Sequence, residues 1–150
     1  MSVELKVKNQ YDRLAEIYDR RWNSYVSNTL NFLINYLRET SQLAGNENVL
    51  DIACGTGELE RMILNVYPNL KIVGVDISEK MLDMAQLKLP QLEFVKASAS
   101  SLPFPDYNFD IVVIVSAFHY FENPVEVLEE IRRILKPKGR LIVMDWCRDY

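Results

Sequence analysis

Two glycines and two acids in this sequence have the residue types and the spacing that could form a ligand site. Asp51 ends the apolar run "NVLD", and Gly55 and Gly57 follow it after a short gap. Glycine tolerates a positive φ and lets a ligand approach the backbone closely. A loop of this kind is found in nucleotide pockets, although a tight turn without any ligand explains two glycines equally well.

The second acid, Asp76, ends the apolar run "KIVGVD" and lies 25 positions after Asp51. Dinucleotide-binding folds place a ribose-binding acid roughly 20 residues after their glycine turn. A carboxylate at that place accepts hydrogen bonds from both ribose hydroxyls of any adenosine ligand. An acid that only stabilises a helix N-terminus through the helix dipole is the structural alternative. We favour the ribose role because the acid stands at a strand end.

Glu60 is the residue at which this loop differs from the dinucleotide-binding fingerprint. The fingerprint GxGxxG, aligned from Gly55, requires a small third residue, and this chain has Glu60 there. A long acid at that position crowds the packing of helix on strand and brings negative charge near a pyrophosphate. The loop therefore favours a ligand without phosphates over NAD.

Residues 1–44 are expected to form a helical segment that packs against the main domain. Residues 11–40 contain neither Gly nor Pro, and an apolar face recurs at helical spacing, made of Leu30, Leu33, Ile34 and Leu37. The aromatic-rich part, residues 11–25, is expected to be one or two separate helices. Taken by themselves, its aromatic residues are best explained by half-buried packing, namely Tyr11, Tyr18, Trp22 and Tyr25.

Residues 45–150 are expected to form the α/β core, since strand and helix patterns alternate after the break "AGNE". Strands are predicted at 48–53, 71–77, 92–98, 111–115 and 140–146. Helices are predicted at 57–67, at 78–89 with Ser78 as N-cap, and from the N-cap Asn123 and Pro124 to a stop at Pro137 and Gly139. This alternation predicts one open, doubly wound α/β domain with a mostly parallel sheet, which binds ligands at the carboxyl ends of its strands.

The composition and the charge of the chain narrow the classes of function. The 150 residues suit one domain, and the net charge of −4 argues against a sequence-independent grip on nucleic acid. No apolar stretch approaches the roughly 20 residues that span a bilayer, and residues 1–10 do not resemble a signal peptide. Two distant cysteines and one histidine do not make a usual zinc site, so no metal is expected. A cytoplasmic location is the default.

Four motifs together resemble class I S-adenosylmethionine-dependent methyltransferases. They are "VLDIACGTGELE", "VGVDISEKMLDMAQ", "LPFPDYNFDIVVIVSAFHYFENP" and "EIRRILKPKGRLIV", in the order and spacing of that family over residues 48–145. The type-11 (UbiE-like) group of small-molecule methyltransferases is the most similar, and "YDRLAEIYDRRW" resembles the N-terminal helix that covers the cofactor there. The resemblance implies a Rossmann-like methyltransferase fold, S-adenosyl-L-methionine as cofactor and a small-molecule methyl acceptor.

The resemblance also implies contacts with the cofactor at matching positions. Asp51 would hold the ammonium group, directly or through water, above a backbone floor of Ala53, Gly55 and Gly57. Asp76 would bind the ribose. Ile77 and Met81 would pack against the two faces of the adenine, and Ser98 and Ala99 would lie at its edge. Ser116 would lie near the methionine part, and either Tyr11 or Tyr18 would close the pocket.

Three positions depart from the family pattern. Ala53 stands where the first glycine is usual, and its methyl group fits if φ is negative there. Ser98 stands where an aspartate commonly accepts from the adenine amino group, so weaker binding is expected. Lys138 replaces a glycine in "KPKG", which we interpret as surface variation.

The family pattern also continues past the fifth strand into further strands, whereas this sequence runs to Tyr150. The domain is therefore expected to be truncated after the fifth strand, which would leave that strand as an apolar sheet edge. Such an edge favours association with another chain. We expect either a fragment or a shortened chain that forms a homodimer through the edge.

His119, the single histidine, is the candidate for a general base or a substrate-orienting residue. A structural residue in the loop "AFHYF" is the alternative. Asp145 and Cys147 are weaker candidates for the acceptor side, and Cys54 is interpreted as a packing residue. Several aromatic residues fit either an apolar acceptor or ordinary core packing: Trp22, Phe118, Tyr120 and Phe121.

Three functions follow as hypotheses. The first is a methyltransferase that acts on a small molecule, in which the protein mainly aligns the acceptor and excludes water, because a sulfonium methyl is already activated. The second is a module that binds S-adenosylmethionine or S-adenosylhomocysteine without transferring methyl. The third is a nicotinamide-dependent oxidoreductase, which Glu60 disfavours.

Overall fold

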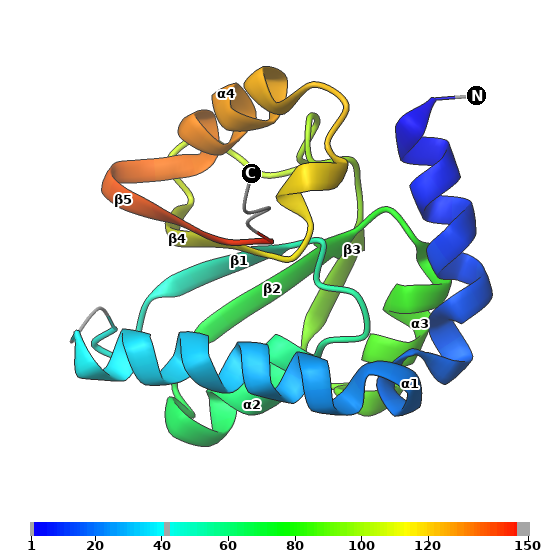
Figure 1. Ribbon diagram of the computed structural model, residues 1–150. Coiled ribbons are helices and arrows are strands. Elements are labelled where there is room, and N and C mark those ends of the chain that lie inside the picture. The colour runs from blue at the N-terminus through cyan, green and yellow to red at the C-terminus, as the bar shows by residue number, and fades with distance from the viewer. Residues whose placement is uncertain (1, 41–42, 147–150) are drawn as a thin grey trace.

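Five parallel strands form a sheet covered on both faces by helices in the computed structural model, which describes residues 2–40 and 43–146 (Figure 1). The strands are β1 (Asn48–Ile52), β2 (Lys71–Asp76), β3 (Glu93–Lys96), β4 (Phe109–Val115) and β5 (Leu135–Met144). The helices are α1 (Val3–Glu39), α2 (Glu58–Val66), α3 (Glu79–Lys88), the short 3-10 helix η1 (Phe118–Tyr120) and α4 (Pro124–Ile134). The predicted open α/β fold is confirmed.

The strand order β3-β2-β1-β4-β5 creates the position where a ligand can bind. β1 pairs in parallel with β2 on one side and with β4 on the other. The chain therefore adds β2 and β3 on one side of β1, and then β4 and β5 on the other side. The connections that leave the carboxyl ends of these two strands run to opposite faces. A crevice at this switch point is where doubly wound sheets bind ligands.

Alternate strand residues are buried on the two faces of the sheet, as expected for parallel strands covered on both sides. On the face toward α1 and α2, one apolar cluster joins Val49 and Ile111 to Leu33, Leu37 and Ile63. On the face toward α4, a second cluster contains the intervening strand residues together with residues of that helix, namely Leu50, Ile52, Val112, Ile114, Val127, Ile131 and Ile134. These two layers fix the carboxyl ends of the central strands.

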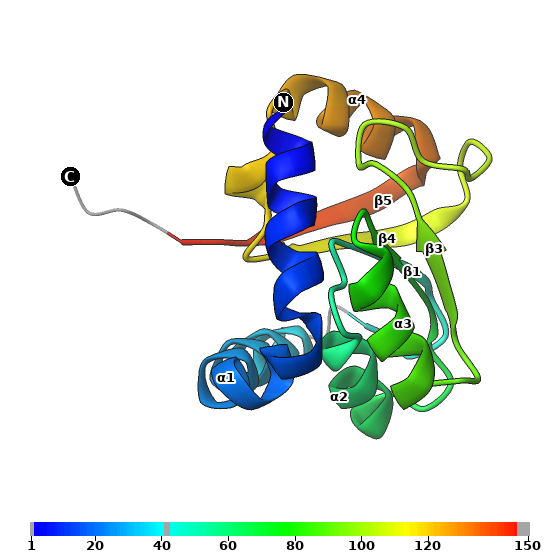
Figure 2. The ribbon, with the colours of Figure 1, turned by 90° about the vertical axis from the view of Figure 1, so that its right-hand side faces the viewer.

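α1 is one continuous helix of 37 residues, so the expected division into separate helices is wrong. The helix bends, and its two arms run in different directions (Figures 1 and 2). The first arm stands beside α3 at the carboxyl edge of the sheet, and the second arm lies along α2. The predicted apolar face of the second arm is confirmed, because its four residues are all buried: Leu30, Leu33, Ile34 and Leu37.

The predicted helix N-caps are confirmed at two sites. The Ser78 hydroxyl accepts from the backbone N–H of Met81 at 3.2 Å, which begins α3. The Asn123 side chain accepts from the backbone N–H of Glu126 at 3.5 Å, with Pro124 in the first turn of α4. These side-chain oxygens satisfy backbone donors that the helix itself leaves unpaired.

The boundary between α4 and β5 differs from the prediction. α4 ends at Ile134, and β5 begins at Leu135, which pairs with Phe109. The residues 136–139 form an irregular stretch before regular pairing resumes at Arg140 with Ile111. The stop signals Pro137 and Gly139 therefore mark an irregularity inside the strand rather than the end of the helix.

β5 lies at one edge of the sheet, and its residues are mostly half-buried (Figure 2). Val143 is its most exposed large apolar side chain, at 42%. Among the described residues, no helix is long and apolar enough to cross a membrane.

Candidate active site

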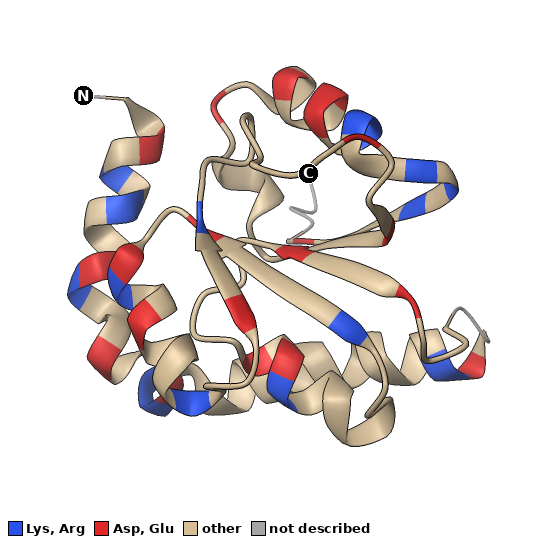
Figure 3. Cartoon of the chain, turned by 180° about the vertical axis from the view of Figure 1, so that it is seen from behind, with Lys and Arg blue, Asp and Glu red and all other residues tan. Residues whose placement is uncertain are grey.

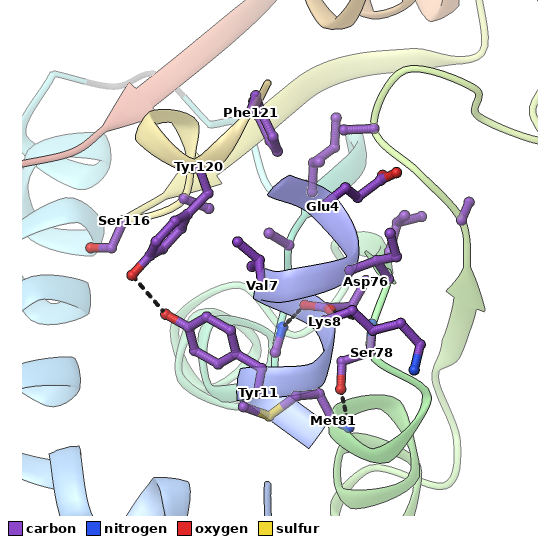
Figure 4. Close-up of a pocket in the computed structure, with 18 of the residues that line it drawn as sticks. Glu4, Val7, Lys8, Tyr11, Asp76, Ser78, Met81, Ser116, Tyr120 and Phe121 are labelled. Carbon is purple, nitrogen blue, oxygen red and sulfur yellow. Dashed lines mark hydrogen bonds between the residues drawn. The ribbon is translucent and has the colours of Figure 1, made fainter. Parts of the chain in front are cut away.

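A cavity lies between the first arm of α1 and the carboxyl ends of β1, β2 and β4 (Figure 4). Its empty volume is about 830 Å³, part of it open to solvent, which is in the range of small-molecule sites. The cavity brings together nine of the positions predicted from sequence: Tyr11, Tyr18, Ala53, Gly55, Asp76, Ile77, Met81, Ala99 and Ser116.

The remaining predicted positions lie around this cavity rather than in its wall. Asp51 lines a neighbouring cavity that shares Tyr18, Ala53, Gly55 and Ser116 with the first one. Ser98 lines another neighbour, next to Ala99, where its hydroxyl is 3.0 Å from the hydroxyl of Ser100. Gly57 and His119 line none of these three cavities.

Asp76 is held by backbone hydrogen bonds at the end of β2. One carboxyl oxygen accepts from the N–H of Gly55 at 2.9 Å, and the other accepts from the N–H of Ser78 at 2.8 Å. Each carboxylate oxygen has a second lone-pair direction. The carboxylate is therefore fixed in orientation and still has the capacity to accept hydrogen bonds from a diol.

The two glycines of the loop have different environments. A Cβ on Gly55, whose φ is 56°, would meet no atom within 4 Å, so the backbone is open to a ligand there. A Cβ on Gly57 would lie 3.2 Å from Ala85 and from Phe94, so this glycine, with a φ of 77°, allows close packing behind the loop. Gly57 therefore has a packing role behind the loop.

Ala53 has a φ of 62°, so the condition for its methyl group to fit easily, a negative φ, is not met. A left-handed conformation brings the Cβ of an L-residue close to the following carbonyl oxygen. Ser116, which follows β4 and lines the same cavity, has a φ of 53°. Two non-glycine residues of the same cavity therefore hold a conformation that the surrounding fold must impose.

Glu60 lies on the buried side of α2, not toward the ligand cavity. Its exposure is 0%, and neither carboxyl oxygen has a hydrogen-bond partner among the described residues. A Cβ on Gly74 would lie 2.7 Å from the Glu60 carboxyl and 2.8 Å from the Cys54 sulfur, so the missing side chain in β2 makes room for both groups. Burial raises the pKa of Glu60 to about 8.

This placement corrects the expected effect of Glu60. Because the carboxyl is mostly protonated at neutral pH and points into the protein, it brings little negative charge to the loop. The crowding expected at the third fingerprint position is relieved by Gly74 in the adjacent strand. Cys54 is buried in the same place, and burial raises its pKa, as suits a packing residue.

Two carboxyl groups face the cavities without a basic partner. Neither Asp51 nor Asp76 forms an ion pair within residues 2–40 and 43–146. Burial, followed by the nearby carboxyl groups of Glu60 and Asp76, raises the pKa of Asp51 well above its ordinary value. Burial also raises the pKa of Asp76, although N–H bonds lower it. A ligand with positive charge and hydroxyl donors would compensate both carboxylates.

Tyrosines from α1 close the cavities against the strand ends. The Tyr11 hydroxyl donates to the Tyr120 hydroxyl at 3.3 Å (Figure 4). The Tyr25 hydroxyl lies 2.9 Å from that of Ser116. Burial, and then the bond with Tyr120, raise the pKa of Tyr11, and burial raises the pKa of Tyr18 to about 12. Tyr11 and Tyr18 therefore keep their phenolic protons at ordinary pH.

Two acids of α1, which the sequence analysis missed, connect this helix to the ligand-facing loops. Asp12 accepts a hydrogen bond from the Ser78 hydroxyl at 2.6 Å. Asp19 accepts from the Thr56 hydroxyl and from Lys88. The two acids are seven residues apart and therefore share a helix face, a spacing that gives a weak signal in the sequence.

His119 forms a pair with Asp145 beyond the end of β5. Its Nδ1 lies 2.7 Å from one carboxyl oxygen of Asp145, and its backbone N–H donates to the other at 3.0 Å. Its ring packs against that of Tyr120, which lines the main cavity. Cys147, the other residue considered for the acceptor side, lies outside the described residues.

Comparison with known proteins decides the family. Residues 50–143 match the type-11 family described as a methyltransferase domain. The chain belongs to this methyltransferase family. The matched residues run from the last part of β1 to β5 and contain both the glycine loop and Asp76.

Individual relatives agree with this family. A demethylmenaquinone methyltransferase from Thermotoga maritima is 37% identical over 144 residues, which are 90% of this chain and 59% of that protein. A solved S-adenosylmethionine-dependent methyltransferase from Aquifex aeolicus has a TM-score of 0.68 and 28% identity, covering 77% of this chain and 66% of that one. A chain from Methanococcus maripaludis shares the fold, with a TM-score of 0.78, 19% identity and coverage of 88% and 62%. The chain spans about three fifths of the Thermotoga relative's length.

Proposed function

We propose that this chain transfers a methyl group from S-adenosyl-L-methionine to a small-molecule acceptor. The observation that carries the proposal is the pair of carboxyl groups that have no basic partner among the described residues, Asp51 and Asp76, at the ends of neighbouring strands beside the open backbone of Gly55. S-adenosylmethionine carries a sulfonium, an ammonium group and a ribose diol, which are the groups that such a site would compensate. Membership of the methyltransferase family supports the same ligand.

The cofactor would extend across the two joined cavities. Asp76 would accept the ribose hydroxyls, and the adenine would lie between Ile77 and Met81. The methionine part would pass Gly55 toward Asp51, which would bind the ammonium group. Around these contacts, the other expected positions would complete the wall: Tyr11, Tyr18, Ala53, Ser98, Ala99 and Ser116.

The chain would catalyse transfer mainly by alignment and by exclusion of water. The first arm of α1 covers the cavity, and residues 1–44 would act as the covering segment over the core formed by residues 45–150. The tyrosine contacts Tyr11–Tyr120 and Tyr25–Ser116 would hold this cover in place. S-adenosylmethionine supplies the activated methyl group when it is bound.

The acceptor is a small molecule in this proposal. The Thermotoga relative is named for demethylmenaquinone, so demethylmenaquinone in its reduced form is the first acceptor to test. Tyr120 and Phe121 give the cavity an aromatic wall that suits an apolar acceptor. The alternative hypotheses, a binding module without transfer and a nicotinamide-dependent oxidoreductase, gain no support from the family comparison.

Titration calorimetry with S-adenosylhomocysteine tests the binding part of the proposal. We expect saturable binding by the wild-type chain and a loss of affinity of at least about tenfold in Asp76→Ala, because hydrogen bonds to a charged group are lost. Asp83→Ala, an exposed acid on α3, is the matched control and should bind like wild type. Absence of binding to the wild-type chain would overturn the proposed function. Transfer of a labelled methyl group to metabolites would then separate an enzyme from a binding module.

Three further expectations belong to this proposal. Acidic and basic residues are intermixed in Figure 3, and the net charge is −4, so we propose that nucleic acid is not a partner.

The edge position of β5 suits pairing of two copies into a homodimer, which light scattering at several concentrations would detect. A cytoplasmic location stays a prediction from cysteine usage.

A further inference from the structure

Two side chains of α4, Glu130 and Arg133, bind the backbone of the connection between β3 and β4. Glu130 accepts from the backbone N–H of Leu102 at 2.8 Å. The Arg133 guanidinium donates to the carbonyl oxygen of Leu102 at 3.1 Å and to that of Phe104 at 2.8 Å. It also donates to the Asp106 carboxyl at 2.8 Å. Both backbone groups of Leu102 are therefore bound by the same pair of side chains.

Glu130 and Arg133 hold each other in a fixed orientation. Arg133 donates to both carboxyl oxygens of Glu130, through Nη2 at 2.7 Å and through Nε at 2.9 Å. The hydrogen bond from Arg133 is the main cause of a lowered pKa of Glu130, so this carboxyl is ionised at neutral pH. A planar guanidinium in a two-point contact loses little more freedom when it forms further hydrogen bonds. The pair is consequently a rigid support for the connection.

A short turn, residues 98–101, lies between two fixed points of this connection. Before the turn, the N–H of Ala97 donates to the carbonyl oxygen of Asp76 at 3.2 Å. After the turn, the side chain of Leu102 is buried in the apolar cluster next to α4. Because only four residues separate the two points, the backbone of Leu102 sets where the turn lies.

The turn borders the cofactor site of the proposed function. Ala97 and Ala99 line the main cavity, and Ser98 and Ser100 line the cavity next to it. In the proposed function, Ser98 and Ala99 lie at the edge of the adenine, where the amino group is. The amino group distinguishes adenine from other purines, so the place of the turn affects which purine is preferred.

We propose that Arg133, supported by Glu130, is a positioning residue that holds the turn 98–101 at the adenine edge and so determines the preference of the site for adenine. This inference rests on the proposed function. Arg133 acts through the backbone of Leu102 and Phe104, because its own side chain is not part of the described wall of the main cavity. Without Arg133 the turn loses its support, whereas the ribose contact at Asp76 stays.

Titration calorimetry with two ligands that differ only in the purine edge tests this role. S-inosylhomocysteine has an oxo group where S-adenosylhomocysteine has the amino group. We expect the wild-type chain to prefer S-adenosylhomocysteine by at least about tenfold, because an oxo group leaves an acceptor in the site unpaired. In Arg133→Gln this preference should fall about fivefold, mainly through weaker binding of S-adenosylhomocysteine.

Three further variants separate positioning from a role in folding alone. Arg133→Lys keeps the charge but not the planar fork, and it should restore part of the preference. Glu130→Gln keeps an acceptor for the N–H of Leu102 and should reduce the preference only about twofold. Arg132→Gln changes the adjacent, exposed arginine and should bind both ligands like wild type. Urea unfolding of each variant measures its stability independently.

The outcomes distinguish this inference from the proposed function. An unchanged preference in Arg133→Gln would overturn the positioning role, whatever the stability of that variant. An equal loss of preference in Arg132→Gln, or a wild-type chain that binds both ligands equally, would also overturn it while the cofactor site stands. Absence of S-adenosylhomocysteine binding by the wild-type chain would overturn the proposed function and this inference together.

Discussion

Lys138 has a strained backbone conformation that the sequence does not reveal. It is exposed, as expected of surface variation, but its φ is 67°, in the region that glycine occupies without strain. We predict that Lys138→Gly raises the free energy of unfolding by about 0.5 to 1 kcal/mol, because relief of strain exceeds the added entropy of the unfolded chain. Urea unfolding measures the change. Lys138→Ala keeps a Cβ and should stay within about 0.5 kcal/mol of wild type.

Glu60 is expected to make stability depend on pH. In the unfolded chain it ionises near pH 4.5, whereas in the folded chain it keeps its proton until about pH 8. Protonation therefore favours folding: this contribution is fully present below pH 4.5 and is lost as the pH rises through 8. From pH 5 to pH 7 the loss of this contribution lowers the free energy of unfolding of the wild-type chain by about 2 to 3 kcal/mol. We predict that Glu60→Gln, which cannot ionise at this position, lacks this decline.

Urea unfolding at several pH values measures this decline for wild type and variant. Asp51 and Asp76 also have raised pKa values, so the difference between the two proteins, not the wild-type slope alone, reports on Glu60 and on its interaction with Asp51. Glu79→Gln removes an exposed acid and should keep the wild-type slope in this range. Equal slopes for wild type and Glu60→Gln would show that the buried carboxyl is ionised in the folded chain.

At the scale of elements, α1 is attached to the ligand-facing loops through Asp12 and Asp19. Asp19 accepts from the Thr56 hydroxyl, next to Gly55, and pairs with Lys88 at 2.6 Å. We predict that Asp19→Asn lowers affinity for S-adenosylhomocysteine about fivefold, because the cover over the cavity loses about 1 kcal/mol of attachment. Calorimetry measures it. Glu16→Gln, an exposed change on the same helix, is the control, and an equal loss there would contradict a specific role for Asp19.

Element boundaries depended on contacts that local sequence does not contain. Ser78 and Asn123 were identifiable as caps because a capping side chain acts on the next few residues. The start of β5 at Leu135 was not identifiable, because its pairing with Phe109 joins residues far apart in the chain. The continuity of α1 through residues 11–25 was likewise missed, since aromatic content does not report where a helix bends.

At the scale of the whole molecule, the second arm of α1 shares its core with the sheet. Leu33 is 3% exposed in the cluster that contains Val49 and Ile111, whereas the adjacent Phe32 is 68% exposed. We predict that Leu33→Ala lowers the free energy of unfolding of the entire chain by about 2 to 5 kcal/mol in one cooperative transition. Phe32→Ala should change it by less than about 0.5 kcal/mol. Denaturant unfolding followed by circular dichroism and by tryptophan fluorescence would show whether the two probes coincide.

The sequence by itself determined the sheet, its parallel sense, the family and the acid at the end of β2, because each depends on local periodicity or on short motifs. Only the tertiary structure decided that Glu60 faces Gly74, that Ala53 is left-handed and that His119 meets Asp145. These features arise where separate strands and helices pack together. The free energy of a buried carboxyl or of a histidine pair is set by neighbours distant in sequence, so no local pattern could reveal it.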